Sequence, residues 1–296
     1  MNITKMLEKS GISFCRDLAV SGRSSFKVGG TVAVAVFPQS REELVTALSL
    51  LDECGIRCEI IGNASNTLFG FDYFDGAMIF TSGISDISVS DKRIYVDCGV
   101  SLGAIARTAL GQGLAGFEFA YGIPGLVGGS VYMNSGAYGS QMSSVVEYSD
   151  AYDRESGEII RIYNHHFGYR KSIYEENKNL VCLGACFLLE PGNEEDIRAR
   201  MNENMSSRRE KQPLEYPSAG SYFKRPEGNF AGKLIEDAGL KGLCVGGACV
   251  SEKHAGFIIN RGGATWQDVL ILEEKIREAV AERFDVVLER EVRLVR

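Results

Sequence analysis

Apolar positions in the first part of the chain switch between the alternation typical of strands and the spacing typical of helices. Thr31–Phe37 alternates and predicts a strand. Ser40 and Glu43 predict a capping box that opens a helix with a leucine stripe, which ends at Gly55. Cys58–Ile61 predicts a second strand, so this stretch is expected to form a β-α-β unit.

The rest of the chain continues this mixture, which predicts an α+β fold. The further expected strands are Ala77–Phe80, Ile87–Val89, Arg93–Cys98, Val145–Tyr152, Glu158–Tyr163, Leu180–Leu189, Ala255–Asn260 and Asp285–Arg296. The positions expected on one face of the last strand are Val287, Glu291, Arg293 and Val295. The further expected helices are Ser101–Leu110, Glu194–Arg209, Ala231–Ala238 and Trp266–Arg283, the last capped by Thr265 with Asp268 at its third position.

The longest stretch without a charged residue, Phe119–Val146, contains six glycines. Pro124 and Asn134 argue against a membrane span, and each glycine costs roughly 1 kcal/mol relative to alanine inside a helix. We therefore expect a buried, largely irregular segment whose backbone approaches another group closely. A flat cofactor would explain that approach, and so would tight packing of two protein layers.

Gly111–Gly116 matches the GxGxxG pattern of dinucleotide-binding folds. That fingerprint follows a strand and opens a helix, whereas this one closes the expected helix Ser101–Leu110. We therefore expect Gly111 or Gly113 to terminate the helix.

Two further loops suit anions. Gly62–Asn66 (GNASN) follows a strand, and its small polar residues and backbone N–H groups suit a phosphate, although a plain β-turn has the same composition. Ser206–Pro226 carries five basic and two acidic residues. Its prolines and the turn Ser218–Ser221 favour an anion-binding loop over a solvated charged face.

Composition excludes several classes of protein. The 296 residues are 45% apolar and 24% charged, which is typical of a globular protein. A net charge of −7 argues against nucleic acid or an anionic membrane as a partner. No segment has the pattern of a signal peptide or a transmembrane helix, so a cytoplasmic location is expected.

Eight cysteines and three histidines are present. No CxxC motif occurs and the spacings do not match the usual ligand pairs, so no metal site is expected. In a cytoplasmic chain the cysteines are expected to remain thiols. Six of them fall in the close pairs Cys54/Cys58, Cys182/Cys186 and Cys244/Cys249.

Five segments carry a specific combination of motifs. They are GNASN at 62–66, GIPGLVGGSVYMNSGAYG at 122–139, YRKS at 169–172, PSAGSYFKRP at 217–226 and LEREVR at 288–293. In this order they resemble the UDP-N-acetylenolpyruvoylglucosamine reductase (MurB) family, over about Ser24 to Arg293. The short link to YRKS and the KRP ending resemble its type II branch, which lacks an extra substrate-covering loop.

The resemblance implies an FAD-binding unit of the PCMH type, with two subdomains of mixed sheets and helices, followed by a smaller α+β substrate-binding domain. Residues 1–76 would form the first FAD-binding subdomain, with the strand 285–296 returning to it. Residues 77–205 would form the second subdomain, and residues 206–284 the substrate-binding domain.

The family also implies a reaction of peptidoglycan synthesis, and hence a link to cell shape and division. NADPH reduces FAD, and the reduced flavin passes a hydride to the double bond of UDP-N-acetylglucosamine enolpyruvate, which gives UDP-N-acetylmuramate. Negative charge develops at the substrate carboxylate, and a proton must reach the α-carbon. The chemistry therefore needs a cation and a proton donor beside the flavin.

Matching the motifs residue by residue implies three catalytic groups. Arg170 of YRKS would stabilise the enolate, and Ser221 would donate the proton. Glu291 would pair with Arg170 and assist at the carboxylate. Without the resemblance, these residues would be interpreted as a hairpin arginine, a turn serine and a solvated glutamate. Arg290 stands where the family often has proline. The backbone conformation at this position can therefore differ from that of the family, but no change of function is expected.

The resemblance implies non-covalent FAD, because neither flavin-binding element contains a histidine. Ala64 stands where the family usually has glycine, and its methyl group would narrow the approach to the phosphate. FAD affinity is therefore the property that this departure would change. Lys211 and Arg225 of the basic loop would contact the diphosphate or nearby groups of the substrate. The residues implied in FAD binding are Gly62, Asn63, Ala64, Ser65, Asn66, Ile123, Pro124, Gly125, Gly128, Gly129, Ser130, Asn134, Gly136, Ala137 and Tyr138.

Two other functions are alternatives to the reductase. The chain could be a flavin-binding regulatory protein that has lost activity, but Arg170, Ser221 and Glu291 are all retained. It could be a flavin oxidase acting on a free sugar, but the loop Pro217–Pro226 and the missing histidine tether argue against this. The sequence does not set the oligomeric state, and a monomer is the favoured assumption.

Overall fold

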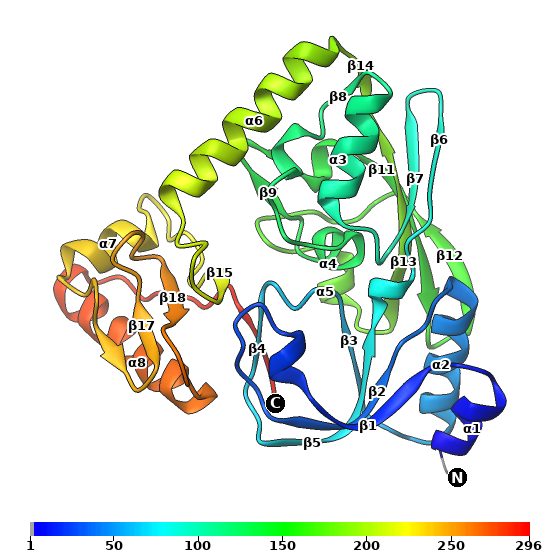
Figure 1. Ribbon diagram of the computed structural model, residues 1–296, viewed down its shortest axis with the longest axis horizontal. Helices are drawn as coiled ribbons and strands as arrows, with labels where there is room; N and C mark the ends of the chain where they lie inside the picture. The colour runs from blue at the N-terminus through cyan, green and yellow to red at the C-terminus, as the bar shows by residue number, and fades with distance from the viewer. Residues whose placement is uncertain (1–2) are drawn as a thin grey trace. The chain divides into compact units, whose positions relative to one another are not determined.

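The computed structural model describes residues 3–296, and the chain forms two compact units. The predicted division into residues 1–76, 77–205 and 206–284 stays a prediction. The first unit comprises the chain up to Arg16, Val34–Asn63 and Gly76–Arg208, and the second comprises Asp17–Ala33, Ala64–Asp75 and Arg209–Arg296 (Figure 1).

A five-stranded sheet organises the first unit. All four of its strand pairings are antiparallel. Helices α3 (Leu102–Gly111) and α4 (Val127–Tyr132) are drawn in Figure 1, and their buried residues belong to the same hydrophobic core as those of the sheet. Gly113, with φ +63°, follows the end of α3 and is the terminating glycine. The strand order is β12 (Glu158–Ile162), β11 (Val146–Asp153), β13 (Leu180–Leu188), β7 (Arg93–Asp97) and β6 (Ile87–Ser90).

A four-stranded sheet has the order β1 (Phe14–Ala19), β2 (Thr31–Val36), β5 (Tyr73–Phe80) and β3 (Cys58–Ile61). Strands β3 and β5 are parallel. Because β5 lies between β2 and β3, the predicted β-α-β unit does not pair its own two strands.

Helix α2 (Arg41–Glu53) begins at the predicted N-cap, where the Ser40 hydroxyl accepts the Glu43 N–H at 3.2 Å. The reciprocal bond differs from the prediction. The Glu43 carboxylate accepts the N–H of Gln39 at 2.8 Å, one residue earlier than a capping box requires.

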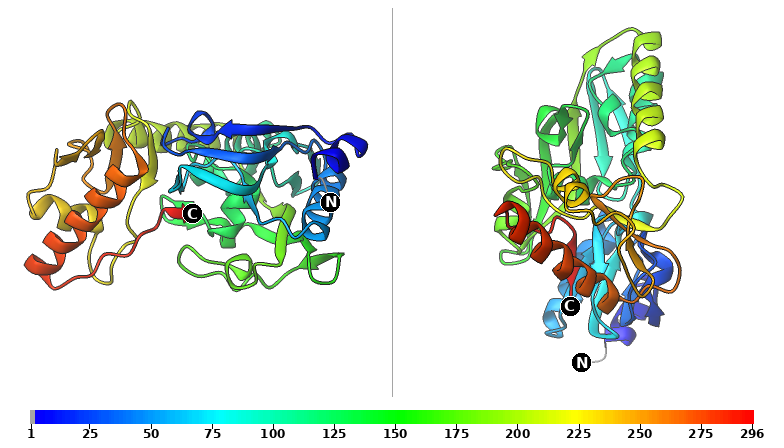
Figure 2. Two further views of the ribbon diagram at one scale, coloured as in Figure 1. Left: turned by 90° about the horizontal axis from the view of Figure 1, so that it is seen from below. Right: turned by 90° about the vertical axis from the view of Figure 1, so that its left-hand side faces the viewer.

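The second unit contains a four-stranded sheet of order β15 (Ser218–Ser221), β18 (Phe257–Asn260), β17 (Ala248–Val250) and β16 (Cys244–Val245). Helices α7 (Ala231–Asp237) and α8 (Trp266–Phe284) pack in the same core (Figures 1 and 2). The predicted capping box of α8, between Thr265 and Asp268, is confirmed.

The C-terminal stretch is the least accurate prediction of an element. Only β19 (Arg293–Val295) is a strand, and it pairs in parallel with β4 (Thr67–Phe69). Arg290 makes a single bridge to Phe223. Val287 is 69% exposed while Val295 is 2% exposed, so the expected shared face does not exist.

The remaining elements are short except for α6 (Glu194–Lys211). They are α1 (Ile3–Lys9), α5 (Ile173–Glu176), β8 (Leu114–Ala115), β9 (Gly136–Ala137), β10 (Ser140–Gln141), β14 (Glu190–Pro191) and the 3₁₀ helices Val20–Arg23, Thr81–Gly83, Glu118–Ala120 and Met142–Ser144.

The uncharged stretch Phe119–Val146 is less irregular and less buried than expected. It contains α4, and Pro124 and Gly129 are exposed. A Cβ added at Gly125 would lie 2.7 Å from the Ser130 hydroxyl oxygen, and one at Gly136 would lie 2.5 Å from the Ser140 carbonyl. Protein packing therefore accounts for these two glycines.

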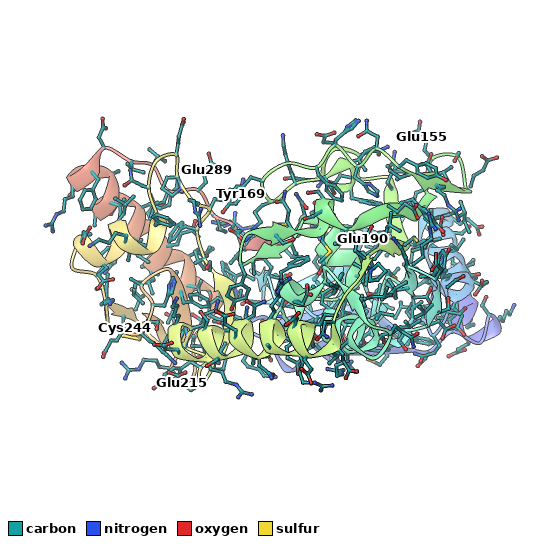
Figure 3. All side chains as sticks on the ribbon, turned by 90° about the horizontal axis from the view of Figure 1, so that it is seen from above. Glu155, Tyr169, Glu190, Glu215, Cys244 and Glu289 are labelled. Atoms are coloured by element: carbon teal, nitrogen blue, oxygen red, sulfur yellow. A yellow bond between two sulfur atoms is a disulfide. The ribbon has the colours of Figure 1, made fainter. Side chains whose placement is uncertain are left out.

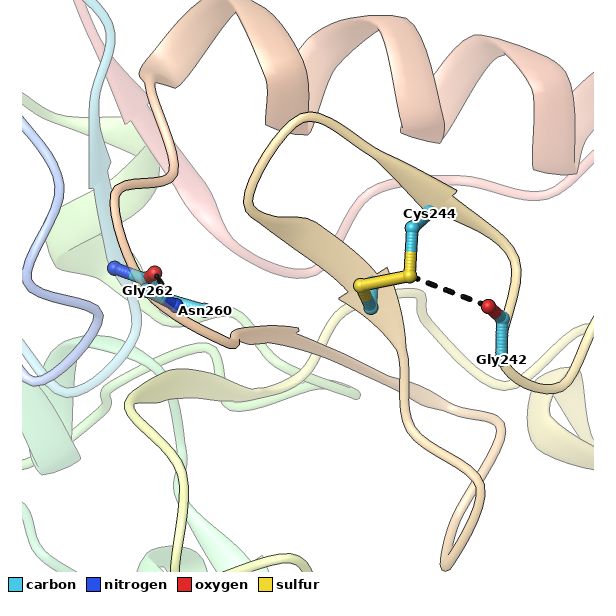
Figure 4. Close-up of a disulfide and its surroundings, with 5 residues drawn as sticks. Gly242, Cys244, Asn260 and Gly262 are labelled. Atoms are coloured by element: carbon cyan, nitrogen blue, oxygen red, sulfur yellow. Dashed lines mark hydrogen bonds between the residues drawn. A yellow bond between two sulfur atoms is a disulfide. The ribbon is translucent and has the colours of Figure 1, made fainter.

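Cys244 and Cys249 form a disulfide, which corrects the expectation of thiols throughout (Figure 4). They lie directly opposite each other on antiparallel β16 and β17, with Cα atoms 4.1 Å apart. Cys182 and Cys186 instead lie along one strand, roughly 13 Å apart at the rise of an extended chain, so they cannot pair. The remaining six cysteines are free.

Thiol titration should report this pairing. Protein unfolded without reductant should give six reactive thiols, and prior reduction should raise the number to eight. A Cys244→Ser variant unfolded without reductant should give seven, because Cys249 is released. Eight thiols in the untreated protein would contradict the disulfide.

Candidate functional site

Within the first unit, Gly62 and Asn63 of one predicted flavin-binding element contact the other element. The Asn63 side-chain amide donates to the Pro124 carbonyl at 2.8 Å. A Cβ on Gly62 would lie 3.6 Å from the Leu126 side chain. The end of β3 and the segment before α4 therefore lie side by side, although about sixty residues separate them in sequence.

Ala64 adopts a backbone conformation that favours glycine. Its φ is +47°, and its side chain is buried. For an L-residue this conformation costs roughly 1–2 kcal/mol. The Ser25 hydroxyl lies 2.8 Å from the Ser218 carbonyl and 3.1 Å from the Ala64 carbonyl, so its single proton is shared between two acceptors beside this turn. Alanine at position 64, where the family usually has glycine, therefore strains the backbone in addition to adding a methyl group to the loop.

The donors of this loop suit an anionic group. Within residues 3–296, none of the backbone N–H groups of Gly62–Asn66 donates to a protein acceptor. Clustered, unused N–H groups in a turn are typical of a phosphate cradle. At Gly129, an added Cβ would meet nothing within 4 Å, so a flat group can approach that backbone. Both observations fit the pyrophosphate and ring of FAD.

Asn134 connects this segment to the loop that carries Arg170. Its amide donates to the Gly168 carbonyl at 3.0 Å and accepts the Ser143 N–H at 3.0 Å. Asn134 is 1% exposed and has φ +43°, which asparagine tolerates better than most residues. Because the protein uses both ends of the amide, its clearest role is to position the Arg170 loop.

Arg170 lies in a tight turn. The Gly168 N–H donates to the Lys171 carbonyl at 3.1 Å, and Arg170 between them has φ +57°. Its guanidinium carbon lies 5.2 Å from the centre of the Tyr169 ring, a half-exposed residue labelled in Figure 3. A bulky residue in this conformation is strained, and such strain concentrates at functional sites.

The base of the Arg170 loop is a buried polar cluster that the sequence reasoning missed. The Ser149 hydroxyl lies 2.7 Å from both His165 Nε2 and the Tyr174 hydroxyl. Burial lowers the pKa of His165, so the ring is neutral at pH 7. The Ser172 hydroxyl donates to the Tyr132 carbonyl at 2.8 Å. The scarcity of histidine in the chain was the only sequence signal for this cluster.

Ser221 and Glu291 lie on adjacent segments of the second unit. Ser221 ends β15 after Gly220, whose φ is +80°, and its side chain is exposed. The carbonyl of the next residue, Tyr222, accepts the Glu291 N–H at 2.9 Å. The Asn66 amide donates to the Glu291 carbonyl at 3.2 Å. Two of the three predicted catalytic residues are thus neighbours, whereas Arg170 belongs to the first unit and its approach to them stays a prediction.

The predicted substrate cations are both exposed residues of the second unit. Lys211 is the last residue of α6 and not part of a loop, because the helix continues two residues past its predicted end at Arg209. The Arg225 guanidinium carbon lies 4.5 Å from the centre of the Phe230 ring. This cation–π contact gives Arg225 a defined side-chain position that its sequence context did not predict.

Two features are absent from the part of the chain that the structure describes. No group of three or more histidine, cysteine, aspartate or glutamate residues could hold a metal ion among residues 3–296. No helix there combines the length and hydropathy needed to cross a bilayer.

Comparison with known proteins identifies the family. The family model for the C-terminal domain of UDP-N-acetylenolpyruvoylglucosamine reductase matches residues 212–295, and the model for an FAD-binding domain matches residues 32–163. The reductase of Caldicellulosiruptor saccharolyticus is 46% identical over 100% of this chain and 96% of its own. That of Caldanaerobacter subterraneus subsp. tengcongensis is 48% identical over 92% of this chain and 90% of its own.

Among solved structures, the crystal structure of the reductase (MurB) from Thermus caldophilus is similar to this one. It has a TM-score of 0.80 and 29% identity, and the match covers 96% of this chain and 99% of that chain. These matches confirm the α+β fold with an FAD-binding domain followed by a C-terminal domain. The chain belongs to the UDP-N-acetylenolpyruvoylglucosamine reductase family.

Proposed function

We propose that the protein reduces UDP-N-acetylglucosamine enolpyruvate to UDP-N-acetylmuramate, with FAD as the bound cofactor and NADPH as the electron donor. Family membership over the full chain is the main support. The observation that carries the catalytic assignment is the adjacency of Ser221 and Glu291 on two hydrogen-bonded segments. The reaction would take place in the cytoplasm, where peptidoglycan precursors are made.

Non-covalent FAD would be held by the loop Gly62–Asn66 and by residues from Ile123 to Tyr138. When bound, FAD would accept two electrons from NADPH and supply them to the substrate. The unused N–H groups of the loop would bind its pyrophosphate, and the open backbone at Gly129 would contact its ring system. Asn134 would act mainly through its hydrogen bonds to the protein.

Three side chains would act on the substrate. Arg170 would stabilise the negative charge that develops at the substrate carboxylate. Ser221 would donate a proton to the α-carbon, for which nearby cations must stabilise the serine alkoxide. Glu291 would assist at the carboxylate and pair with Arg170. Lys211 and Arg225 would bind the dianionic diphosphate.

A bulky residue at Gly129 should prevent FAD binding without preventing folding. In Gly129→Leu the added side chain would fill the open space beside the backbone and exclude the flavin ring. Flavin absorbance per purified protein should fall at least tenfold, while the circular dichroism spectrum should be unchanged. Gly125 is unsuitable for this test, because its Cβ would collide with Ser130.

Gly111→Leu is the matched control for Gly129→Leu. Gly111 is also helical, and an added Cβ there also meets nothing within 4 Å, but it lies outside both proposed flavin elements. It should retain normal flavin content. Equal flavin loss in both variants, or full flavin content in Gly129→Leu, would contradict the assignment of Gly129.

Steady-state kinetics tests the function. The purified protein should show a flavin spectrum and should oxidise NADPH rapidly only when UDP-N-acetylglucosamine enolpyruvate is present. A bound flavin without substrate-dependent turnover would indicate a flavin-binding protein without reductase activity. Oxygen consumption with a free sugar would indicate an oxidase.

A further inference from the structure

An ion pair between a buried carboxylate and a partly exposed arginine joins helix α8 to the two segments that carry Ser221 and Glu291. Glu273 of α8 is only 3% exposed. Arg290 Nε donates to both of its carboxylate oxygens, at 3.0 and 2.8 Å, and a terminal nitrogen of Arg290 lies 2.8 Å from Oε2. The Tyr222 hydroxyl donates to Oε2 at 2.8 Å.

The partners of Glu273 are the chain neighbours of the proposed catalytic residues. Tyr222 follows Ser221, and Arg290 precedes Glu291. Their backbones are also joined, because the Tyr222 carbonyl accepts the Glu291 N–H and Phe223 forms a bridge with Arg290. The Glu273 carboxylate on helix α8 thus binds both Tyr222, the neighbour of Ser221, and Arg290, the neighbour of Glu291.

The chemistry of the three groups favours a fixed geometry. Two of the Arg290 nitrogens face the carboxylate, so the pair specifies orientation as well as distance. Burial and the charge of Glu273 raise the pKa of Tyr222, which keeps its hydroxyl protonated and able to donate. Because the Glu273 carboxylate is buried, removing its charge would leave Arg290 without its partner, so the pair holds the two segments in one arrangement.

We infer that Glu273, Arg290 and Tyr222 form a positioning network that fixes the proton donor Ser221 relative to Glu291. The inference deepens the proposed function and rests on it. It also gives the arginine at 290, where the family often has proline, a specific role in this chain. The three side chains bind one another, so in this proposal they act on Ser221 and Glu291 through the backbone.

The first test compares half-reactions in Glu273→Gln. The carboxamide keeps the shape and an acceptor for Tyr222 but removes the charge that faces Arg290. Reoxidation of the NADPH-reduced enzyme by UDP-N-acetylglucosamine enolpyruvate should slow roughly 10- to 100-fold per bound flavin, because small displacements of catalytic groups have effects of this size. Reduction of the flavin by NADPH should change less than twofold.

Two controls separate positioning from stability. Glu274→Gln changes the next residue of the same helix, an exposed carboxylate 3.7 Å from Arg277, and should leave both half-reactions unchanged. The double variant Glu273→Met/Arg290→Met leaves no unpaired buried charge, so it should fold, yet it should reoxidise as slowly as Glu273→Gln. Normal reoxidation in the double variant would overturn the inference, as would equal slowing of both half-reactions in Glu273→Gln.

Hydrogen exchange gives a readout that does not depend on activity. In Glu273→Gln without substrate, peptides containing Tyr222 and Glu291 should exchange their amide protons at least tenfold faster, and peptides of the five-stranded sheet should not change. Unchanged exchange at both segments would refute the network even if turnover fell. If the unmodified enzyme is not reoxidised by the substrate, the proposed function fails, while the exchange measurement still tests the network.

Discussion

Ser221→Ala is expected to slow reoxidation of the NADPH-reduced enzyme by UDP-N-acetylglucosamine enolpyruvate by roughly 10²- to 10⁴-fold, the usual contribution of a general acid. Removing the hydroxyl removes the proposed proton donor to the α-carbon. Electron transfer from NADPH to FAD needs no such proton, so that half-reaction should stay within about twofold of the unmodified enzyme. Anaerobic stopped-flow absorbance of the flavin measures both.

Ser218→Ala is the matched control, because Ser218 lies at the other end of the same strand β15. It should leave both half-reactions unchanged. If Ser221→Ala slowed reduction and reoxidation equally, Ser221 would not be the proton donor. Normal reoxidation in Ser221→Ala would lead to the same conclusion.

Replacement of Arg170 should separate activity from stability. Arg170→Ala and Arg170→Gly both remove the cation at the substrate carboxylate, so both should slow reoxidation by roughly 10²- to 10³-fold. Arg170 has φ +57°, where glycine is unstrained. The free energy of unfolding, measured by denaturant titration, should therefore be about 1 kcal/mol higher for Arg170→Gly than for Arg170→Ala.

Lys171→Ala is the control for charge in the same turn. Lys171 is exposed and lies one residue from Arg170, so its loss should change the reoxidation rate less than threefold. A loss of activity in Lys171→Ala equal to that in Arg170→Ala would indicate a general electrostatic effect. Equal stability of the alanine and glycine variants would contradict the strained backbone at position 170.

Local signals in the sequence predicted most of the secondary structure. The cap of α8 was predictable because Thr265 and Asp268 satisfy each other's backbone N–H groups without help from distant residues. The strand Asp285–Arg296 was overestimated because alternation alone does not provide a partner. Only its last part finds one, in β4. The disulfide was missed because it depends on the register of β16 against β17, which sequence spacing does not specify.

The site shows the same division between local and long-range information. The motifs identified Arg170, Ser221 and Glu291 as candidates, but not the contacts that hold them. The role of Asn134 depends on the Gly168 carbonyl, which lies 34 positions away. The side chains of Tyr222 and Arg290 are connected because both bind Glu273, which lies on a separate helix. Neither contact leaves a pattern within one segment of the sequence.

A single anaerobic turnover tests the central claim most directly. The enzyme is reduced with one equivalent of NADPH and mixed with UDP-N-acetylglucosamine enolpyruvate in the absence of oxygen. We predict that the absorbance of oxidised FAD returns and that one UDP-N-acetylmuramate forms per flavin. An enzyme that stays reduced until oxygen is admitted, with no UDP-N-acetylmuramate formed, would contradict the proposed function.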